Sequence, residues 1–133
     1  SGQLSKNQVL RLCGKTDLAE LSGLFKNADL YIGSETGAYH LSVAVDIPTI
    51  CILGGGVWGR FAPYPDYFSS DRNMLVYRKM DCFGCHWDCC HERPLCIEQI
   101  TIDMVWGKVS KALALCESEK WCKKDRDIEV GRV

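Results

Sequence analysis

The sequence predicts an α/β fold, a Rossmann-like parallel sheet flanked by helices. Short apolar segments alternate along the chain with segments whose apolar residues recur at helical spacing. This alternation is typical of parallel strands joined by right-handed helical crossovers. The segment 48–53 is almost wholly apolar, as expected for a strand that is buried on both faces. In such a sheet we expect a ligand outside the carboxyl ends of the strands.

The first predicted elements are a strand over residues 9–13, which ends at Gly14, and a helix that begins after Asp17. Asp17 and Glu20 have the spacing of a capping box, in which each side chain accepts a hydrogen bond from the other's backbone N–H. The residues at helical spacing that form the apolar face of this helix are Leu18, Leu21, Leu24 and Phe25.

The later elements continue the alternation. We predict a strand over 29–33, a helix over 36–45, strands over 48–53 and 74–77, and a last helix over 101–116. The chain of 133 residues has the length of a single domain. We therefore expect one domain over 1–133, comprising a core over about 9–116, which includes a cysteine-rich loop over 82–96, and a charged tail over 117–133. The chain begins at Ser1 and Gly2 without a methionine, so we expect its boundaries to be experimental.

The charge balance excludes one class of partner. With 16 Lys+Arg against 17 Asp+Glu, the net charge of -1 lacks the basic excess of a general nucleic-acid binder. No segment reaches the roughly 18 apolar residues of a membrane span, and no basic-then-apolar signal peptide opens the chain. We therefore expect a cytoplasmic protein with no nucleic-acid partner and no transmembrane segment.

The segment between the strand 29–33 and the next helix is the best candidate for a phosphate site. Ser34, Thr36 and Gly37 place hydroxyl groups and an open backbone at the start of that helix, where N–H groups and the helix dipole attract anions. His40 follows on the first turn and, when protonated, could reach a phosphate oxygen. Glu35 fits better as an acceptor for sugar hydroxyls or for a backbone amide. The alternative is that Ser34 or Thr36 only caps the helix and that His40 is a core histidine.

Residues 54–59 match the pattern G-x-G-x-x-G after a strand, but Pro63 and Pro65 exclude the helix that a dinucleotide site requires. The glycines can instead form a backbone loop close to a ligand. Arg60 is either a bidentate partner for a diphosphate or a surface arginine. The sequence contains no complete set of catalytic residues.

Five of the nine cysteines fall within 82–96, and Cys82-x-x-Cys85 has the spacing of zinc ligands. Cys89, Cys90, His91 or Cys96 could complete a tetrahedral structural site, although no second C-x-x-C occurs. The alternatives are reduced thiols, oxidised pairs or a redox-active pair. The residues that we name as candidate ligands are Cys82, Cys85, Cys90 and Cys96.

Four runs of residues carry a resemblance to a known family. They are Leu12-x-Gly14-Lys15-Thr16-x-Leu18-x-Glu20-Leu21, Ala28-Asp29-Leu30-x-Ile32-Gly33, Glu35-Thr36-Gly37-x-x-His40-Leu41-x-x-Ala44 and Pro48-Thr49-x-x-x-Leu53-Gly54. On these runs the sequence resembles glycosyltransferase family 9, the lipopolysaccharide heptosyltransferase family, over about residues 9–116. This chain differs from the family at Glu35, where Asp is usual, and at 54–56, where a Gly-Pro-Thr type of loop is usual.

The resemblance implies a GT-B enzyme, in which two Rossmann-like halves face each other, and this chain resembles the C-terminal half that binds the sugar donor. The donor is typically ADP-heptose. Thr36, Gly37 and His40 would contact its diphosphate, His40 would stabilise the leaving group, and the turn with Lys15 and Thr16 would lie beside the nucleotide. The implied donor-binding residues are Lys15, Thr16, Ser34, Glu35, Thr36, Gly37, His40, Gly54 and Gly55.

The resemblance also implies what this chain lacks. The acceptor site and the catalytic base would belong to an N-terminal half, so the chain alone would bind nucleotide weakly and be inactive. Transfer to a lipopolysaccharide-type or other glycan would be inverting and metal-independent, with no required cofactor, and the full enzyme would be peripheral at the inner membrane. From its place after the last predicted strand, we expect the cysteine-rich loop to have a structural role, away from the predicted donor site. The alternative function is a small zinc-stabilised module that binds a protein partner through the cysteine-rich loop.

Overall fold

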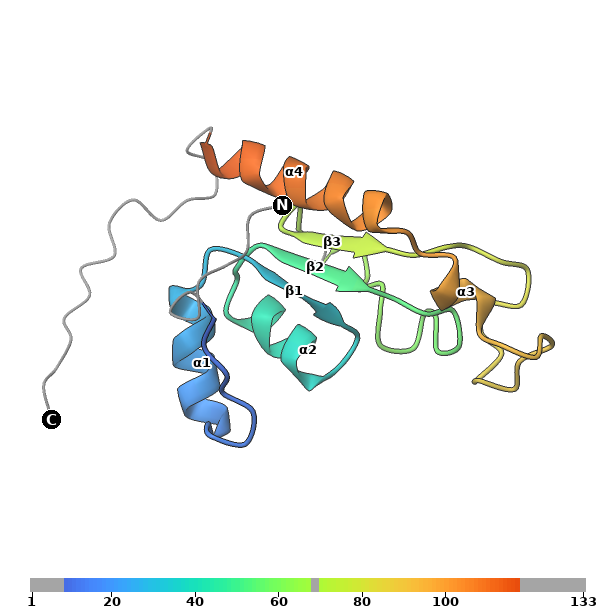
Figure 1. The fold of residues 1–133 in the computed structure, drawn as a ribbon, viewed down its shortest axis with the longest axis horizontal. Helices are drawn as coiled ribbons and strands as arrows, with labels where there is room; N and C mark the ends of the chain where they lie inside the picture. The colour runs from blue at the N-terminus through green and yellow to red at the C-terminus, as the bar shows by residue number, and fades with distance from the viewer. Residues whose placement is uncertain (1–8, 68–69, 118–133) are drawn as a thin grey trace, which may run out of the picture.

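The computed structural model describes residues 9–67 and 70–117, which form a parallel sheet between two layers of helices (Figure 1). The strands are β1 (Tyr31–Ser34), β2 (Thr49–Ile52) and β3 (Asn73–Val76), in the spatial order β1-β2-β3. Both pairings are parallel. The predicted α/β fold class is confirmed, and so are the predicted strands over 29–33, 48–53 and 74–77.

The helices cover both faces of the sheet. Helix α2 (Gly37–Ala44) packs on β1 and β2, and α1 (Leu18–Asn27) packs beside α2. Helix α4 (Ile102–Glu117) packs on β2 and β3, on the opposite face of the sheet (Figure 1). The three predicted helices are confirmed, and a short helix, α3 (Leu95–Glu98), precedes α4.

The core forms on both faces of β2, because successive side chains of a strand point in opposite directions. Ile50 packs with Met74 and Val76 against Val109 and Ala112 of α4. On the other face, a second cluster contains Tyr39, Cys51, Leu53 and Ala62. The burial of β2 on both faces explains why its sequence is apolar without alternation.

The predicted strand over 9–13 is wrong. Residues 9–12 have no regular structure, and Val9 and Leu10 are 53% and 78% exposed. A strand needs a paired neighbour to satisfy its backbone groups, and within the described residues no strand pairs with this segment. An apolar run alone does not establish such a pairing.

The capping box at the start of α1 is confirmed. The Asp17 carboxylate accepts a hydrogen bond from the backbone N–H of Glu20 at 2.8 Å, and the Glu20 carboxylate accepts one from the backbone N–H of Asp17 at 2.9 Å. The predicted apolar face is only partly covered, because α1 contains no fully buried residue and Leu18 is 71% exposed.

Two further predictions concern the charged tail and membrane spans. The charged tail over 117–133 lies outside them from residue 118 onwards. In residues 9–67 and 70–117, no helix is both long and apolar enough to cross a bilayer.

Candidate functional site

The segments that leave the three strands converge at one end of the sheet, as the parallel topology requires. Glu35 and Thr36 follow β1, the glycines at 54–56 follow β2, and the segment from Tyr77 to the cysteine-rich loop follows β3. This end of the sheet therefore brings together most of the residues that the sequence selects for donor binding.

Helix α2 begins at this end without a side-chain cap. Thr36 occupies the N-cap position with an extended backbone (φ -147, ψ 176), but its side chain makes no capping hydrogen bond. Its hydroxyl donates instead to the carbonyl oxygen of Ser34, at a long 3.4 Å. No acidic residue lies in the first turn of α2. The first N–H groups of the helix thus lack a side-chain acceptor from the N-cap, and they can donate hydrogen bonds to a bound anion.

His40 lies on the first turn of α2 and contacts two neighbours through its ring nitrogens. Its Nε2 is 2.9 Å from Oε1 of Glu35, and its Nδ1 is 2.5 Å from the hydroxyl of Tyr64. Glu35 comes from the segment after β1 and Tyr64 from the irregular segment after β2. This network joins three separate segments of the chain, so the position of the Glu35 carboxylate depends on the other two.

The network differs from the expectation for His40. Because Glu35 and Tyr64 occupy both ring nitrogens, a His40 N–H that reaches a phosphate must first leave one of them. The histidine side chain is 34% exposed, so it is not a fully buried core residue. In this structure His40 orients Glu35.

Aromatic rings surround His40. The ring centroids of Tyr39, Tyr64 and Phe61 lie 4.9, 5.8 and 6.5 Å from that of His40. Burial raises the pKa of Tyr39 to about 12 and also raises the pKa of Tyr64, so both phenols stay protonated. Tyr64 lies in a segment that also contains Phe61 and Tyr67, and the sequence analysis did not connect it to His40. The density of aromatic residues between prolines was the available signal.

The glycine segment 54–56 lies against the cysteine-rich loop. A Cβ atom on Gly55 would lie 2.2 Å from the Phe83 ring, and one on Gly56 would lie 2.3 Å from the Trp87 ring. The backbone N–H of Gly84 donates to the carbonyl of Gly55 at 2.8 Å. The expectation that the cysteine-rich loop lies away from the predicted donor site is therefore wrong. The close approach that requires glycine here is to aromatic rings of the same chain.

The remaining candidates lie outside the Glu35 network. Lys15 and Thr16 lie in the turn before α1, where the backbone N–H of Lys15 donates to the carbonyl of Leu12 at 3.0 Å. Arg60 is exposed, and its guanidinium lies 4.9 Å from the centroid of the Phe61 ring. Both sites are accessible from solvent, although neither is hydrogen-bonded to the network among the described residues.

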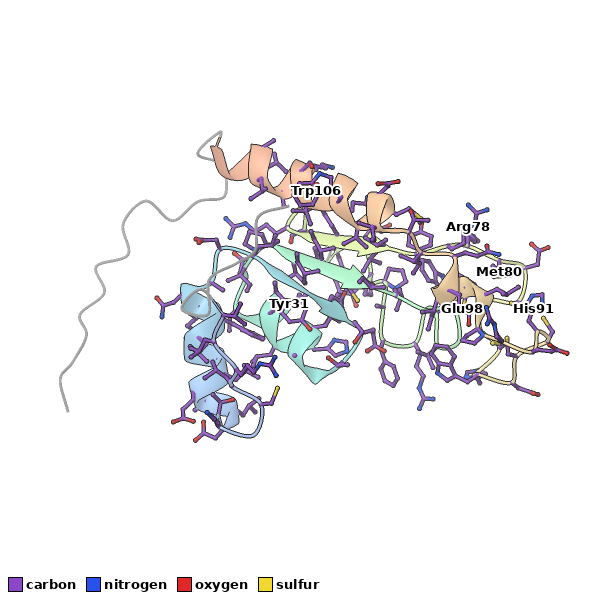
Figure 2. The ribbon with its side chains drawn as sticks, in the orientation of Figure 1. Tyr31, Arg78, Met80, His91, Glu98 and Trp106 are labelled. Carbon is purple, nitrogen blue, oxygen red and sulfur yellow. The ribbon has the colours of Figure 1, made fainter. Side chains whose placement is uncertain are left out.

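The structure separates the four candidate metal ligands. The donor atoms of Cys82, Cys90 and His91 all lie within 4.8 Å of one another. Cys96 is buried elsewhere, with its sulfur 3.4 Å from the backbone N–H of Gly55, and Cys85 lies outside the three-residue group. Figure 2 shows His91 at the same end of the molecule as Arg78, Met80 and α3.

Comparison with known proteins finds a match to a protein family. No curated protein and no solved structure matches the chain. The sequence model of glycosyltransferase family 9 (heptosyltransferase) matches residues 2–86. That match covers more than half of the chain and includes the three strands, α2 and the Glu35 network. A self-standing zinc-stabilised module is not favoured. The chain belongs to glycosyltransferase family 9.

Proposed function

We propose that this chain is the donor-binding, C-terminal half of a GT-B glycosyltransferase and that its ligand is a nucleotide-diphosphate sugar similar to ADP-heptose. The observation that carries the proposal is the uncapped start of α2 beside Glu35. A diphosphate supplies the acceptors that the first N–H groups of α2 lack. The match to the family supports the activity, and the local geometry supports the place of binding.

Each group at this site has a proposed role. The N–H groups at Thr36, Gly37 and the next residues hold the diphosphate, and Glu35 accepts hydrogen bonds from hydroxyls of the donor sugar. His40 and Tyr64 keep the Glu35 carboxylate in position. Ser34 and Gly54 border the sugar, Gly55 supports this edge of the site, and Lys15 and Thr16 contact the nucleotide.

The reaction proceeds by inversion, without a metal. The acceptor hydroxyl attacks the anomeric carbon, and the bond from that carbon to the diphosphate oxygen breaks with its electron pair on the diphosphate. The acceptor proton passes to a carboxylate of the N-terminal half. The dipole of α2 stabilises the charge that develops on the diphosphate. The acceptor is a lipopolysaccharide-type or other glycan, and the full enzyme acts at the cytoplasmic side of the inner membrane.

Titration with ADP, followed by NMR of the amide signals, tests the proposal. We expect signals of Thr36, Gly37 and His40 to shift with ADP and ADP-heptose, and to shift much less with adenosine at the same concentration. Signals of Val109 and Ala112 serve as the control, because these residues belong to α4, which packs on the opposite face of the sheet from α2. If saturating ADP leaves the α2 signals unmoved, the proposed site is wrong. This chain alone should transfer no sugar.

A further inference from the structure

The cysteine-rich loop contains a second cluster of functional side chains, which the donor site does not use. Cys82, Cys90 and His91 place two sulfur atoms and one imidazole nitrogen within 4.8 Å of one another. Cys82 lies eight positions before Cys90 and nine before His91, so the fold of the loop brings them together.

The cysteine-rich loop reverses its direction through backbone conformations that are unfavourable unless surrounding contacts stabilise them. Gly84 has φ +85, and the non-glycine residues His86 and Trp87 also have positive φ, of 52 and 69. Positive φ is uncommon for a residue with a side chain, and it persists where surrounding contacts impose it. The result of this reversal is that Cys90 and His91 return to the start of the loop, beside Cys82.

The three donor atoms match the chemistry of zinc. Thiolate sulfur and imidazole nitrogen are the usual ligands of Zn²⁺, at about 2.3 Å and 2.0–2.1 Å, which places the ligand atoms of a tetrahedron roughly 3.5–3.8 Å apart. The three donor atoms already lie within 4.8 Å of one another, so small side-chain movements are enough for them to bind the ion. Hard cations such as Mg²⁺ and Ca²⁺ prefer oxygen ligands, and this group offers none.

The surroundings leave space for a fourth ligand. The cluster borders a hollow of about 650 Å³, which is lined also by Arg78, Lys79 and Gln99. A water molecule therefore has access to the fourth corner of the tetrahedron. Cys90 and His91 are exposed and Cys82 is half-buried, so the ion itself can enter from solvent.

The loop also contacts the segment that borders the proposed donor site. The backbone N–H of Gly84 donates to Gly55 at 2.8 Å, and that of His86 donates to Gly56 at 2.7 Å. Both donors lie between Cys82 and Cys90 in the sequence. Fixing the two ends of this stretch would hold its hydrogen bonds to the glycines in place.

We propose that Cys82, Cys90 and His91 bind one zinc ion, which fastens the cysteine-rich loop onto the glycine segment 54–56. On binding, the two thiols release their protons to solvent, the sulfur atoms coordinate as thiolates, and neutral His91 coordinates through one ring nitrogen. The role of the zinc ion is structural, and it is separate from the binding of the sugar donor.

The test is a metal titration of the reduced, metal-free 133-residue chain. Co²⁺ should bind at one equivalent, with sulfur-to-metal charge-transfer bands and the visible spectrum of a tetrahedral site, and Zn²⁺ should displace it. Zinc binding should also release protons and slow proteolysis within 82–96. Cys90→Ser and His91→Ala should each weaken Co²⁺ binding at least tenfold. Circular dichroism establishes that each variant is folded.

The matched control is Cys89→Ser, which removes a neighbouring thiol outside the group and should bind Co²⁺ as the unchanged chain does. Three results would overturn the proposal. The first is the absence of stoichiometric Co²⁺ binding, and the second is an equal loss of binding in Cys89→Ser. The third is a Cys82–Cys90 disulfide in protein purified without added oxidant, detected as the loss of two hydrogens by mass spectrometry.

Discussion

Helices α1 and α2 begin in opposite ways. At the start of α1, Asp17 and Glu20 satisfy each other's backbone N–H groups. At the start of α2, Thr36 has the extended backbone of an N-cap residue, but its side chain leaves the helix uncapped. Both termini carry the same partial positive charge, because that charge arises from the peptide groups themselves. The difference lies in whether the chain provides its own acceptors.

The packing of the two helices explains why α1 needs an N-terminal cap and α2 does not. Helix α1 contains no fully buried residue, so local hydrogen bonds must stabilise it. Helix α2 buries Tyr39 and Ser42 completely, and the Ser42 hydroxyl accepts a hydrogen bond from Thr49 of β2 at 3.0 Å. Packing on the sheet can offset an absent cap, which costs about 0.5–2 kcal/mol. Helix α2 can therefore keep its N–H groups open for a ligand.

Giving α2 the cap that α1 has should produce the largest effect. In Thr36→Asp, the new carboxylate would accept hydrogen bonds from the first turn of α2 and would repel a diphosphate. We expect the affinity for ADP to fall at least tenfold, as measured by isothermal titration calorimetry, while the free energy of unfolding stays the same or rises.

Thr36→Asn separates the two causes in that experiment, because an asparagine caps a helix without a charge. It should weaken ADP binding less than Thr36→Asp does. If Thr36→Asp binds ADP as tightly as the unchanged chain, the diphosphate does not bind at the start of α2.

The two helix termini also show how far the sequence alone could lead. The capping box of α1 was predictable, because Asp17 and Glu20 interact over three residues and need nothing else from the fold. The open terminus of α2 was not, since a threonine before a helix has the same sequence pattern whether or not its hydroxyl caps. Tyr64 was missed as the partner of His40 because 24 residues separate them, and only the packing of the segment after β2 joins them.

The predictions of a strand over 9–13 and of a cysteine-rich loop away from the donor site were wrong for a related reason. Apolar residues favour an extended strand, but pairing depends on a neighbour that the local pattern does not specify. The contact of Phe83 with Gly55 is likewise set by tertiary structure. The parallel pairing of β1 with β2, by contrast, was predictable, because a helix lies between these two strands in the sequence.

Removing the cap of α1 should have the next largest effect. In Asp17→Ala the backbone N–H of Glu20 loses its acceptor, and the position no longer favours a helix start. We expect a loss of about 1 kcal/mol in the free energy of unfolding, measured by urea denaturation. The control is Asp66→Ala, an exposed aspartate outside any helix, which should change stability by less than about 0.5 kcal/mol. Equal losses in both variants would show that the capping box does not stabilise α1.

The smallest effect should come from Glu20→Gln, which tests whether α1 needs the charge or only the acceptor. Glutamine at this position can still accept the hydrogen bond from the backbone N–H of Asp17, so the capping box persists. Only the attraction between the carboxylate and the helix dipole is lost, which is worth about 0.3–1 kcal/mol at an exposed site and is screened by salt. The difference in unfolding free energy from the unchanged chain should therefore shrink as salt is added, whereas Glu20→Ala should keep most of its loss at high salt. A loss in Glu20→Gln that salt does not reduce would mean that hydrogen-bond geometry, rather than charge, distinguishes the two side chains, and the comparison with α2 would then rest on acceptors alone.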